Sequence, residues 1–420
     1  MNRSSAGLMA IVLALLVPSA SARQASDDSL LEARRGFQTE LLEKVRDGEP
    51  LPEPPKELFS LVSYPTPVGT MNAYLSKPPK RGQKAPAIIW ITGGFPPGGA
   101  DPSAWEPAPL ENDQSAKSYR EAGLVMMYPA LRGSYDNPGY QESFYGEVDD
   151  VLAALEYLSG VEGVDPSRIY LGGHSTGGTL ALLVAAASDR FRGVIAFGPV
   201  EDPAGYGQGS LTYDVENEKE RRLRAPIHFL GAIRTPTFVI EGTEQGNIDS
   251  VEELRASCSN DRVHFLVARG ADHFNLLAPV NALIAKKIID AGGRALELTQ
   301  ADIDQAIEPL RVAEREASDL EQLAGLRRRG IDIRVVQKIT FYLAGTDKAA
   351  LEAVAKTAKQ DRFQASEPEQ QEGFDGEEFL LLRLERSIKL SNLEDLLAAS
   401  AKAAGYEKPE TVHYLGWGVE

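Results

Sequence analysis

Residues 168–187 read RIYLGGHSTGGTLALLVAAA, and they predict a strand, a sharp turn and a helix in immediate succession. The apolar run 168–171 leads into Gly173-His174-Ser175-Thr176-Gly177, and the alanine-rich run 179–187 leads out of it. This order is typical of a nucleophile elbow, in which a strained serine stands at a helix N-terminus. The flanking glycines permit a close crossing of strand and helix, and the helix dipole favours an oxyanion beside Ser175.

Composition limits the classes of protein to consider. The chain has 420 residues, 43% of them hydrophobic, and can build two ordinary cores. A net charge of −17 argues against a nucleic-acid surface, which needs a basic face. A single cysteine, Cys258, cannot form an internal disulfide. The five histidines lack the spacing of a metal site, and we expect neither a metal nor a cofactor.

The first 22 residues have the pattern of a secretory signal peptide. Arg3 precedes the ten-residue apolar stretch 8–17, and Ala20-Ser21-Ala22 follows as a small-residue cleavage site. The apolar stretch is too short to span a bilayer, which takes about 20 residues. We therefore expect a periplasmic or secreted protein with no membrane attachment after cleavage.

Residues 23–57 predict a charged helix over 30–46 and a proline-rich linker over 50–55. Strand and helix patterns then alternate over 58–295. The predicted strands are a hairpin at 58–75 and single runs at 85–92, 123–128, 168–171, 193–197, 237–240 and 263–267. This alternation predicts an α/β domain with a doubly wound, mostly parallel sheet that is covered on both faces.

Several short motifs occur in this domain: Leu131-Arg-Gly-Ser134, Gly146-Glu-Val-Asp-Asp150, Val164-Asp-Pro-Ser-Arg-Ile169, the elbow, and Gly270-Ala-Asp-His-Phe274. With these motifs, the domain resembles the catalytic domain of the prolyl oligopeptidase family within the α/β-hydrolase fold. The family's large N-terminal propeller has no counterpart here. We expect only a modest lid over 201–234, with Tyr206, Tyr213, His228 and Phe229, and an open site that suits small esters, amides or short peptides.

The resemblance implies the remaining catalytic residues. In such hydrolases the histidine follows the serine and the acid in the chain, which leaves His264, His273 and His413. His264 lies inside an apolar strand and is expected in the core, whereas His273 follows that strand in a loop and is predicted to be the general base. The oxyanion hole is expected from the N–H of Thr176 and that of Gly94 or Phe95.

The acid is where the sequence departs from the family. The family places an aspartate three residues after the glycine that closes the seventh strand, and Gln245 holds that place after Gly242. Glu244 is the adjacent carboxylate and is predicted as the acid. Asp249 is the alternative, although it also suits a helix N-cap. Asp202 is the next carboxylate to consider.

The C-terminal part predicts a helical connector over 296–330 and a separate domain over 331–420. The domain's order is strand, helix, two strands, helix, strand, which is ferredoxin-like. Its opening strand 335–342, the helix after Gly345-Thr-Asp347 and the closing Tyr414-Leu-Gly-Trp-Gly418 resemble the regulator of ribonuclease activity B family, with Leu415 where that family has aspartate. Export and acidity conflict with a literal ribonuclease role. We expect a protein-interaction or substrate-gating module, or else a stabilising appendage.

Two functions are consistent with these features. In the first, the chain is an exported serine hydrolase that cleaves small esters, amides or short peptides through an acyl-enzyme on Ser175. In the second, it is a catalytically inactive hydrolase-fold protein that binds a partner through its C-terminal domain. The retained serine, histidine and oxyanion glycines favour the enzyme.

Overall fold

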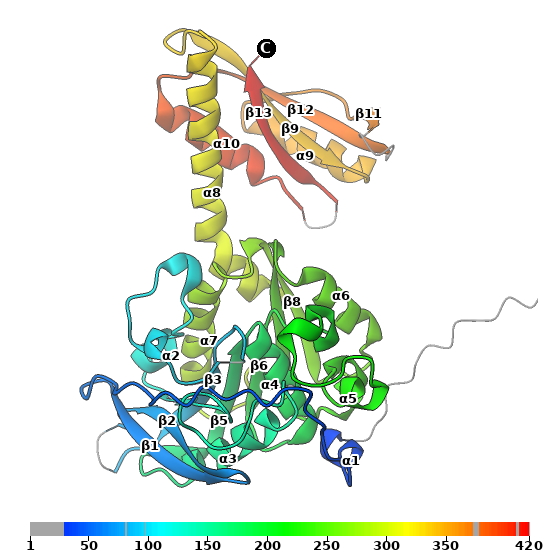
Figure 1. Ribbon diagram of the computed structural model, residues 1–420. Helices are drawn as coiled ribbons and strands as arrows, with labels where there is room; N and C mark the ends of the chain where they lie inside the picture. The colour runs from blue at the N-terminus through cyan, green and yellow to red at the C-terminus, as the bar shows by residue number, and fades with distance from the viewer. Residues whose placement is uncertain (1–28, 80–81, 97, 373–377, 409–410, 420) are drawn as a thin grey trace, which may run out of the picture.

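The computed structural model describes residues 29–79, 82–96, 98–372, 378–408 and 411–419. The predicted signal peptide lies outside these residues. Figure 1 shows two bodies, a large one built on a central sheet and a small one, joined by a single long helix. Within the described residues, every helix is too short or too polar to cross a bilayer.

The large body contains an eight-stranded sheet in the order β1-β2-β4-β3-β5-β6-β7-β8. Strands β1 and β2 form an antiparallel hairpin that joins β4 antiparallel, and every other pair in the sheet is parallel. The strands are β1 (Phe59–Thr66), β2 (Gly69–Ser76), β3 (Ala85–Ile91), β4 (Val125–Pro129), β5 (Val164–His174), β6 (Gly193–Phe197), β7 (Thr237–Glu244) and β8 (Val263–Asp272). The predicted mostly parallel α/β-hydrolase sheet is confirmed.

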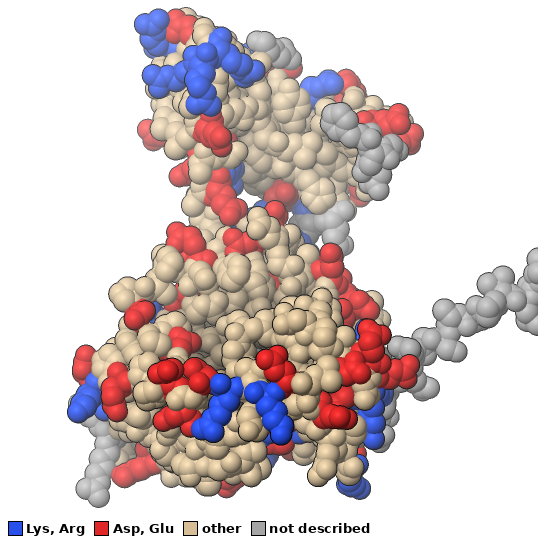
Figure 2. Space-filling model, viewed as in Figure 1, with Lys and Arg blue, Asp and Glu red and all other residues tan. Residues whose placement is uncertain are grey.

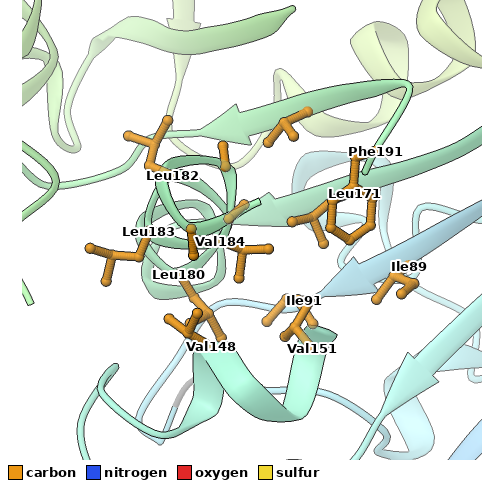
Figure 3. Packing of buried hydrophobic residues seen from close by; sticks show 14 of the residues in the cluster. Ile89, Ile91, Val148, Val151, Leu171, Leu180, Leu182, Leu183, Val184 and Phe191 are labelled. Carbon is orange, nitrogen blue, oxygen red and sulfur yellow. The ribbon is translucent and has the colours of Figure 1, made fainter. Parts of the chain in front are cut away.

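Helices cover both faces of this sheet (Figure 1). They are α1 (Leu30–Ala33), α2 (Ser118–Glu121), α3 (Glu147–Ser159), α4 (Thr176–Ala187), α5 (Glu218–Arg222), α6 (Ile248–Ser257), α7 (Leu277–Ala291) and α8 (Gln300–Arg328). Helix α4 is buried at every position, as expected for a helix that is apolar all round. Figure 3 shows it packed among side chains of α3, β3 and β5, including Val148, Ile91 and Leu171.

The N-terminal helix predicted over 30–46 is wrong beyond Ala33. Only Leu30–Ala33 is helical, and the following segment runs extended across the large body. Thr39 donates to Glu220 Oε2 at 2.9 Å, and the backbone N–H of Glu40 donates to Glu220 Oε1 at 2.7 Å. These contacts with a buried carboxylate and the positive φ of 71° at Gly36 outweigh the local helical preference.

The small body is a ferredoxin-like domain, as predicted. Its sheet has the order β10-β12-β9-β13, with β11 also paired to β12, and all pairs are antiparallel. Helices α9 and α10 pack against this sheet. The elements are β9 (Val336–Gly345), α9 (Lys348–Gln360), β10 (Gln364–Ala365), β11 (Glu369–Glu372), β12 (Glu378–Lys389), α10 (Leu393–Ala404) and β13 (His413–Val419).

Helix α8 belongs to both bodies. Ile303 and Ile307 lie in a core cluster of the large body, whereas Leu326 lies in the core of the small one. Near the same end, the indole of Trp417 donates to Asp319 Oδ1 at 2.7 Å. The ferredoxin-like domain therefore includes the last turns of α8, and a boundary at residue 331 is too late.

The direction of α8 sets the position of the small body. Gln300, at the start of α8, exchanges hydrogen bonds with the backbone of Val267, and Arg311 lies against Gly270 farther along β8. The helix thus advances in the same direction as β8 and continues past the carboxyl end of that strand. Arg311 also forms an ion pair of 2.6 Å with Glu407 of the small body. The ferredoxin-like domain is therefore held on the side of the sheet's carboxyl edge (Figure 1).

A buried ion pair connects two of the sequence motifs named above. Arg132 binds Asp150 through Nε and Nη2 at 3.0 and 2.8 Å, and its Nη1 pairs with Glu142 at 2.8 Å. Beside them lies Glu147, which is 1% exposed. Burial raises the pKa of Glu147 to about 7, although the charge of Arg132 opposes the rise.

This pKa shift predicts that Glu147→Gln raises the free energy of unfolding by an amount that depends on pH. A carboxyl group whose pKa is higher in the folded state favours folding while protonated, so its ionisation destabilises the fold as pH rises through 4.5 to 7. At pH 8 the variant should have a free energy of unfolding higher by about 1–2 kcal/mol, and at pH 5 this gain should shrink. Urea unfolding of the wild type and the variant at pH 8 and pH 5 measures this difference. An equal change in the free energy of unfolding at the two pH values would contradict a raised pKa for Glu147.

Candidate active site

The elbow residue Ser175 has φ 55° and ψ −117°, a strained conformation for a residue that is not glycine. Its N–H donates to the carbonyl of Phe197 at 2.7 Å, which anchors the turn on β6. A Cβ at Gly173 would lie 2.3 Å from the carbonyl oxygen of Gly177, and one at Gly177 would lie 2.3 Å from that of Ile91. The glycines are therefore required by the close crossing of strand and helix, as the sequence predicted.

The loop after β3 lies against the N-terminus of α4. The Thr176 hydroxyl donates to the carbonyl of Gly94 at 2.6 Å, and Gly94 has a φ of 116°, which favours glycine. The N–H of Thr176 opens the helix, where the first N–H groups have no intrahelical acceptor. The predicted oxyanion residues Thr176, Gly94 and Phe95 are thus brought together beside Ser175.

His273 is positioned by a tight turn directly after β8. The carboxylate of Asp272 accepts hydrogen bonds from the N–H groups of Phe274 and Asn275, both at 2.8 Å, and Asn275 Oδ1 accepts from the N–H of Asp272 at 2.9 Å. These bonds fix the backbone on both sides of His273. The ring of His273 is buried and is directed into the large body rather than into solvent.

The carboxylate that binds His273 is Glu241. Its Oε2 lies 2.8 Å from His273 Nδ1, and its Oε1 accepts the N–H of Gly242 at 2.7 Å. Glu241 is fully buried in β7. Gly198, with φ 52°, leaves the room for this pair, because a Cβ there would lie 2.2 Å from Glu241 Oε2 and 2.4 Å from His273 Cε1. Such a carboxylate fixes the ring orientation and stabilises an imidazolium.

The structure corrects the predicted position of the acid. Glu244 is exposed and accepts a hydrogen bond from its neighbour Thr243. Asp249 is exposed near the start of α6, where Asn247 holds the N-cap position. Asp202 pairs with Arg221 at 2.5 Å. None of these three carboxylates is hydrogen-bonded to the His273 ring in the described residues, and Glu241 is the partner of Nδ1.

The sequence did contain a signal for Glu241. The apolar run at the start of β7, Thr237-Phe-Val-Ile240, continues directly into this carboxylate before the glycine. A charged residue is almost never buried without a partner. A carboxylate that continues a buried parallel strand to its carboxyl edge therefore predicts an ion pair or a catalytic role.

His174, inside the elbow, has a positioning role that the sequence analysis missed. Its Nε2 lies 2.9 Å from the carbonyl oxygen of His273, and its Nδ1 lies 2.9 Å from Gln114 Nε2. Since a carbonyl only accepts, His174 donates from Nε2 and accepts at Nδ1. Burial and the nearby His273 lower the pKa of His174 to about 3. His174 therefore stays neutral and holds the His273 loop through its hydrogen bond to the carbonyl of His273.

The Ser175 hydroxyl faces Tyr206, which ends a 3₁₀ turn at Pro203–Tyr206. Burial and the charge of Glu201 raise the pKa of Tyr206 to about 12, and the Ser175 hydroxyl opposes this rise. No hydrogen bond between Ser175 and His273 is recorded in the described residues, a common situation in hydrolases without substrate. Within the predicted lid, this turn contacts the serine through Tyr206. Tyr213 and Phe229 are core residues.

The other predicted histidines lie elsewhere. His264 is exposed on β8 and stacks on Phe238 with ring centroids 5.1 Å apart, so the expectation of a core residue is wrong. His413 is exposed at the start of β13. Among the residues that the structure describes, no group of three or more His, Cys, Asp or Glu side chains could hold a metal ion. A cavity of about 420 Å³ borders the loop Gly93–Pro96.

Comparison with known families confirms both resemblances. The model of the prolyl oligopeptidase family matches residues 111–274, and that of regulator of ribonuclease activity B matches residues 316–419. The first match contains Ser175, Glu241 and His273. The second begins inside α8, which agrees with the shared helix described above. No curated protein sequence matches this chain significantly.

Solved structures with a similar fold include three hydrolases. The 2,6-dihydroxy-pseudo-oxynicotine hydrolase is 18% identical, with a TM-score of 0.45, over 58% of this chain and 72% of that one. An acylaminoacyl peptidase bound to a chloromethyl ketone is 16% identical, with a TM-score of 0.45, over 60% of this chain and 44% of that one. A puromycin-hydrolyzing peptidase of Mycobacterium tuberculosis is 19% identical, with a TM-score of 0.45, over 57% of this chain and 40% of that one. This chain thus spans less than half of the two peptidases.

The geometry predicts different effects for the two neighbouring glutamates. Glu241→Gln should lower the rate of ester turnover by about 10³- to 10⁴-fold, because the imidazolium formed on His273 loses its counter-charge. Glu244→Gln, at an exposed position on the same strand, should keep a rate close to that of the wild type. Steady-state kinetics on a chromogenic ester, with circular dichroism to verify folding, measures both. A larger loss in Glu244→Gln would return the acid to the position first predicted.

Proposed function

We propose that this chain is a serine hydrolase that cleaves small esters, amides or short peptides through an acyl-enzyme on Ser175. One observation carries the proposal: His273, which follows β8, is bound through Nδ1 to the buried Glu241 and lies next to a strained serine elbow. The match to the prolyl oligopeptidase family over the same residues supports hydrolase chemistry.

The proposed reaction uses the site residues in sequence. Ser175 Oγ attacks the substrate carbonyl while His273 Nε2 accepts its proton, and Glu241 stabilises the imidazolium. The N–H of Thr176 and that of Gly94 or Phe95 bind the oxyanion. His273 then gives its proton to the leaving group, which departs and leaves the acyl-enzyme. Water, deprotonated by His273, releases the acid and restores Ser175.

A tagged fluorophosphonate tests this chemistry without a known substrate. The wild type should be labelled at Ser175, and Ser175→Ala should lose the label while keeping its thermal unfolding midpoint, since the serine contributes chemistry and little packing. Mass spectrometry of the labelled peptide locates the adduct. A folded wild type that is never labelled would instead support the alternative, a catalytically inactive hydrolase-fold protein that binds a partner.

We also propose that the ferredoxin-like domain limits the size of the substrate. Its place on the side of the sheet's carboxyl edge supports this role, because Ser175 and His273 lie at that edge. A group of basic side chains at its outer end, where α8 closes with Arg327 and Arg328, supports a second role in binding an acidic partner protein (Figure 2). The leader-like sequence at residues 1–22 supports export.

Deleting residues 316–420, from the point in α8 where the match to the small domain begins, tests the gating role. The hydrolase should remain folded, because its core clusters are separate from that of the small domain. Turnover of single aminoacyl esters should be unchanged, whereas cleavage of longer peptides should increase several-fold as the edge becomes open. Fluorophosphonate labelling serves as the control for an intact site. Unchanged discrimination between the two substrate sizes would contradict gating.

A further inference from the structure

We propose that Glu201 and Tyr206 form a subsite beside Ser175 for a cationic group of the substrate, an ammonium or a guanidinium. This inference rests on the proposed hydrolase function. It adds the substrate class, an acyl compound that carries a positive charge close to the scissile carbonyl.

The first argument is that two polar atoms at this place lack partners. Glu201 Oε2 and the hydroxyl of Tyr206 are both buried from solvent, and neither has a hydrogen-bond partner of ordinary geometry among the described residues. A buried polar atom without a partner costs free energy, and a carboxylate oxygen costs more than a neutral one. Buried atoms of this kind in native structures call for an explanation, and a bound ligand is one.

The second argument is their location. Glu201 directly follows Val200, whose N–H binds the hydroxyl of Thr179 in the first turn of α4, the helix that Ser175 precedes. The Tyr206 hydroxyl faces Ser175, and the charge of Glu201 raises the pKa of Tyr206. The ring of Phe95, from the oxyanion loop, meets the ring of Tyr206 edge to face, with centroids 4.8 Å apart. A group bound between Glu201 and Tyr206 would therefore belong to a substrate whose carbonyl is at Ser175.

Hydrogen bonds hold the backbone on both sides of Glu201, so the position of its Cα is fixed. The N–H of Val200 donates to the Thr179 hydroxyl at 3.0 Å, and the carbonyl of Glu201 accepts from the N–H of Ile227. The next residue, Asp202, caps the 3₁₀ turn through the N–H of Ala204 and pairs with Arg221. Of two consecutive carboxylates, Asp202 thus has structural partners, whereas the Oε2 of Glu201 has none among the described residues.

The chemistry of the two atoms selects a cation. An ammonium has three donors and no acceptor, which matches a carboxylate oxygen and a phenol oxygen that have no hydrogen-bond partner of ordinary geometry among the described residues. The phenol stays neutral at ordinary pH, because its pKa is about 12. An anionic group would be repelled by Glu201, and a neutral alkyl group would leave both oxygens unpaired.

Four p-nitroanilides test the subsite and locate the charge: those of lysine, norleucine, N-acetyl-lysine and N-acetyl-norleucine. The wild type should have a kcat/KM for at least one charged member about 10- to 100-fold above that for N-acetyl-norleucine, the range expected for a hydrogen-bonded charge pair. Preference for norleucine over its N-acetyl form would place the α-amine in the subsite. Preference for N-acetyl-lysine over N-acetyl-norleucine would place the side chain there.

Glu201→Gln should remove most of this preference, measured as the ratio of kcat/KM between charged and neutral members. Glu218→Gln is the matched control: Glu218 is an exposed glutamate on α5, and its substitution changes the net charge equally. The control should keep the preference. A wild type that cleaves all four equally, or a preference that survives Glu201→Gln, would overturn the inference.

Protection from labelling gives a readout that does not depend on anilide cleavage. Benzylamine should slow fluorophosphonate labelling of Ser175 at concentrations at least about tenfold lower than benzyl alcohol does, and Glu201→Gln should abolish this difference. Labelling without any amine-specific protection would overturn the subsite alone. Absence of labelling in a folded wild type would overturn the proposed hydrolase function, and the subsite with it.

Discussion

The close crossing of β5 and α4 at Ser175 is the constraint on which the site depends. Helix α4 can begin one residue after the serine only because Gly173 and Gly177 allow backbone to pack on backbone, and because the helix is buried at every position. The same crossing holds the Thr176 hydroxyl against the carbonyl of Gly94. One packing arrangement therefore places Ser175 at the helix N-terminus and brings Thr176 to the Gly94 loop, as the proposed oxyanion site requires.

The histidine is fixed to this crossing from two directions. Glu241, from β7, binds the Nδ1 of His273, and His174, the residue before the serine, binds the carbonyl of His273. The rings of His174 and His273 lie 4.5 Å apart. Because His174 remains neutral, it adds no positive charge beside His273, whose ring is bound to the carboxylate of Glu241.

The sequence predicted what depends on local pattern. The elbow, the mostly parallel sheet and the ferredoxin-like order followed from apolar periods and short motifs, as with the run 168–187, whereas His273 followed from the chain order of the family that the domain resembles. The acid did not, because a pattern counted from Gly242 pointed to exposed carboxylates, whereas burial selected Glu241. The helix predicted over 30–46 failed for a similar reason. Contacts with Glu220, 180 residues farther along the chain, determine its conformation.

The central claim is that Ser175, His273 and Glu241 act as one catalytic unit. A crystal structure of the wild type after reaction with a phosphonate tests it most directly. We predict phosphorus bonded to Ser175 Oγ, the phosphonyl oxygen within hydrogen-bond distance of the Thr176 N–H, and Glu241 still bound to His273 Nδ1. An adduct whose oxygen points away from Thr176, or a His273 ring bound to Glu244 or Asp249, would contradict the account.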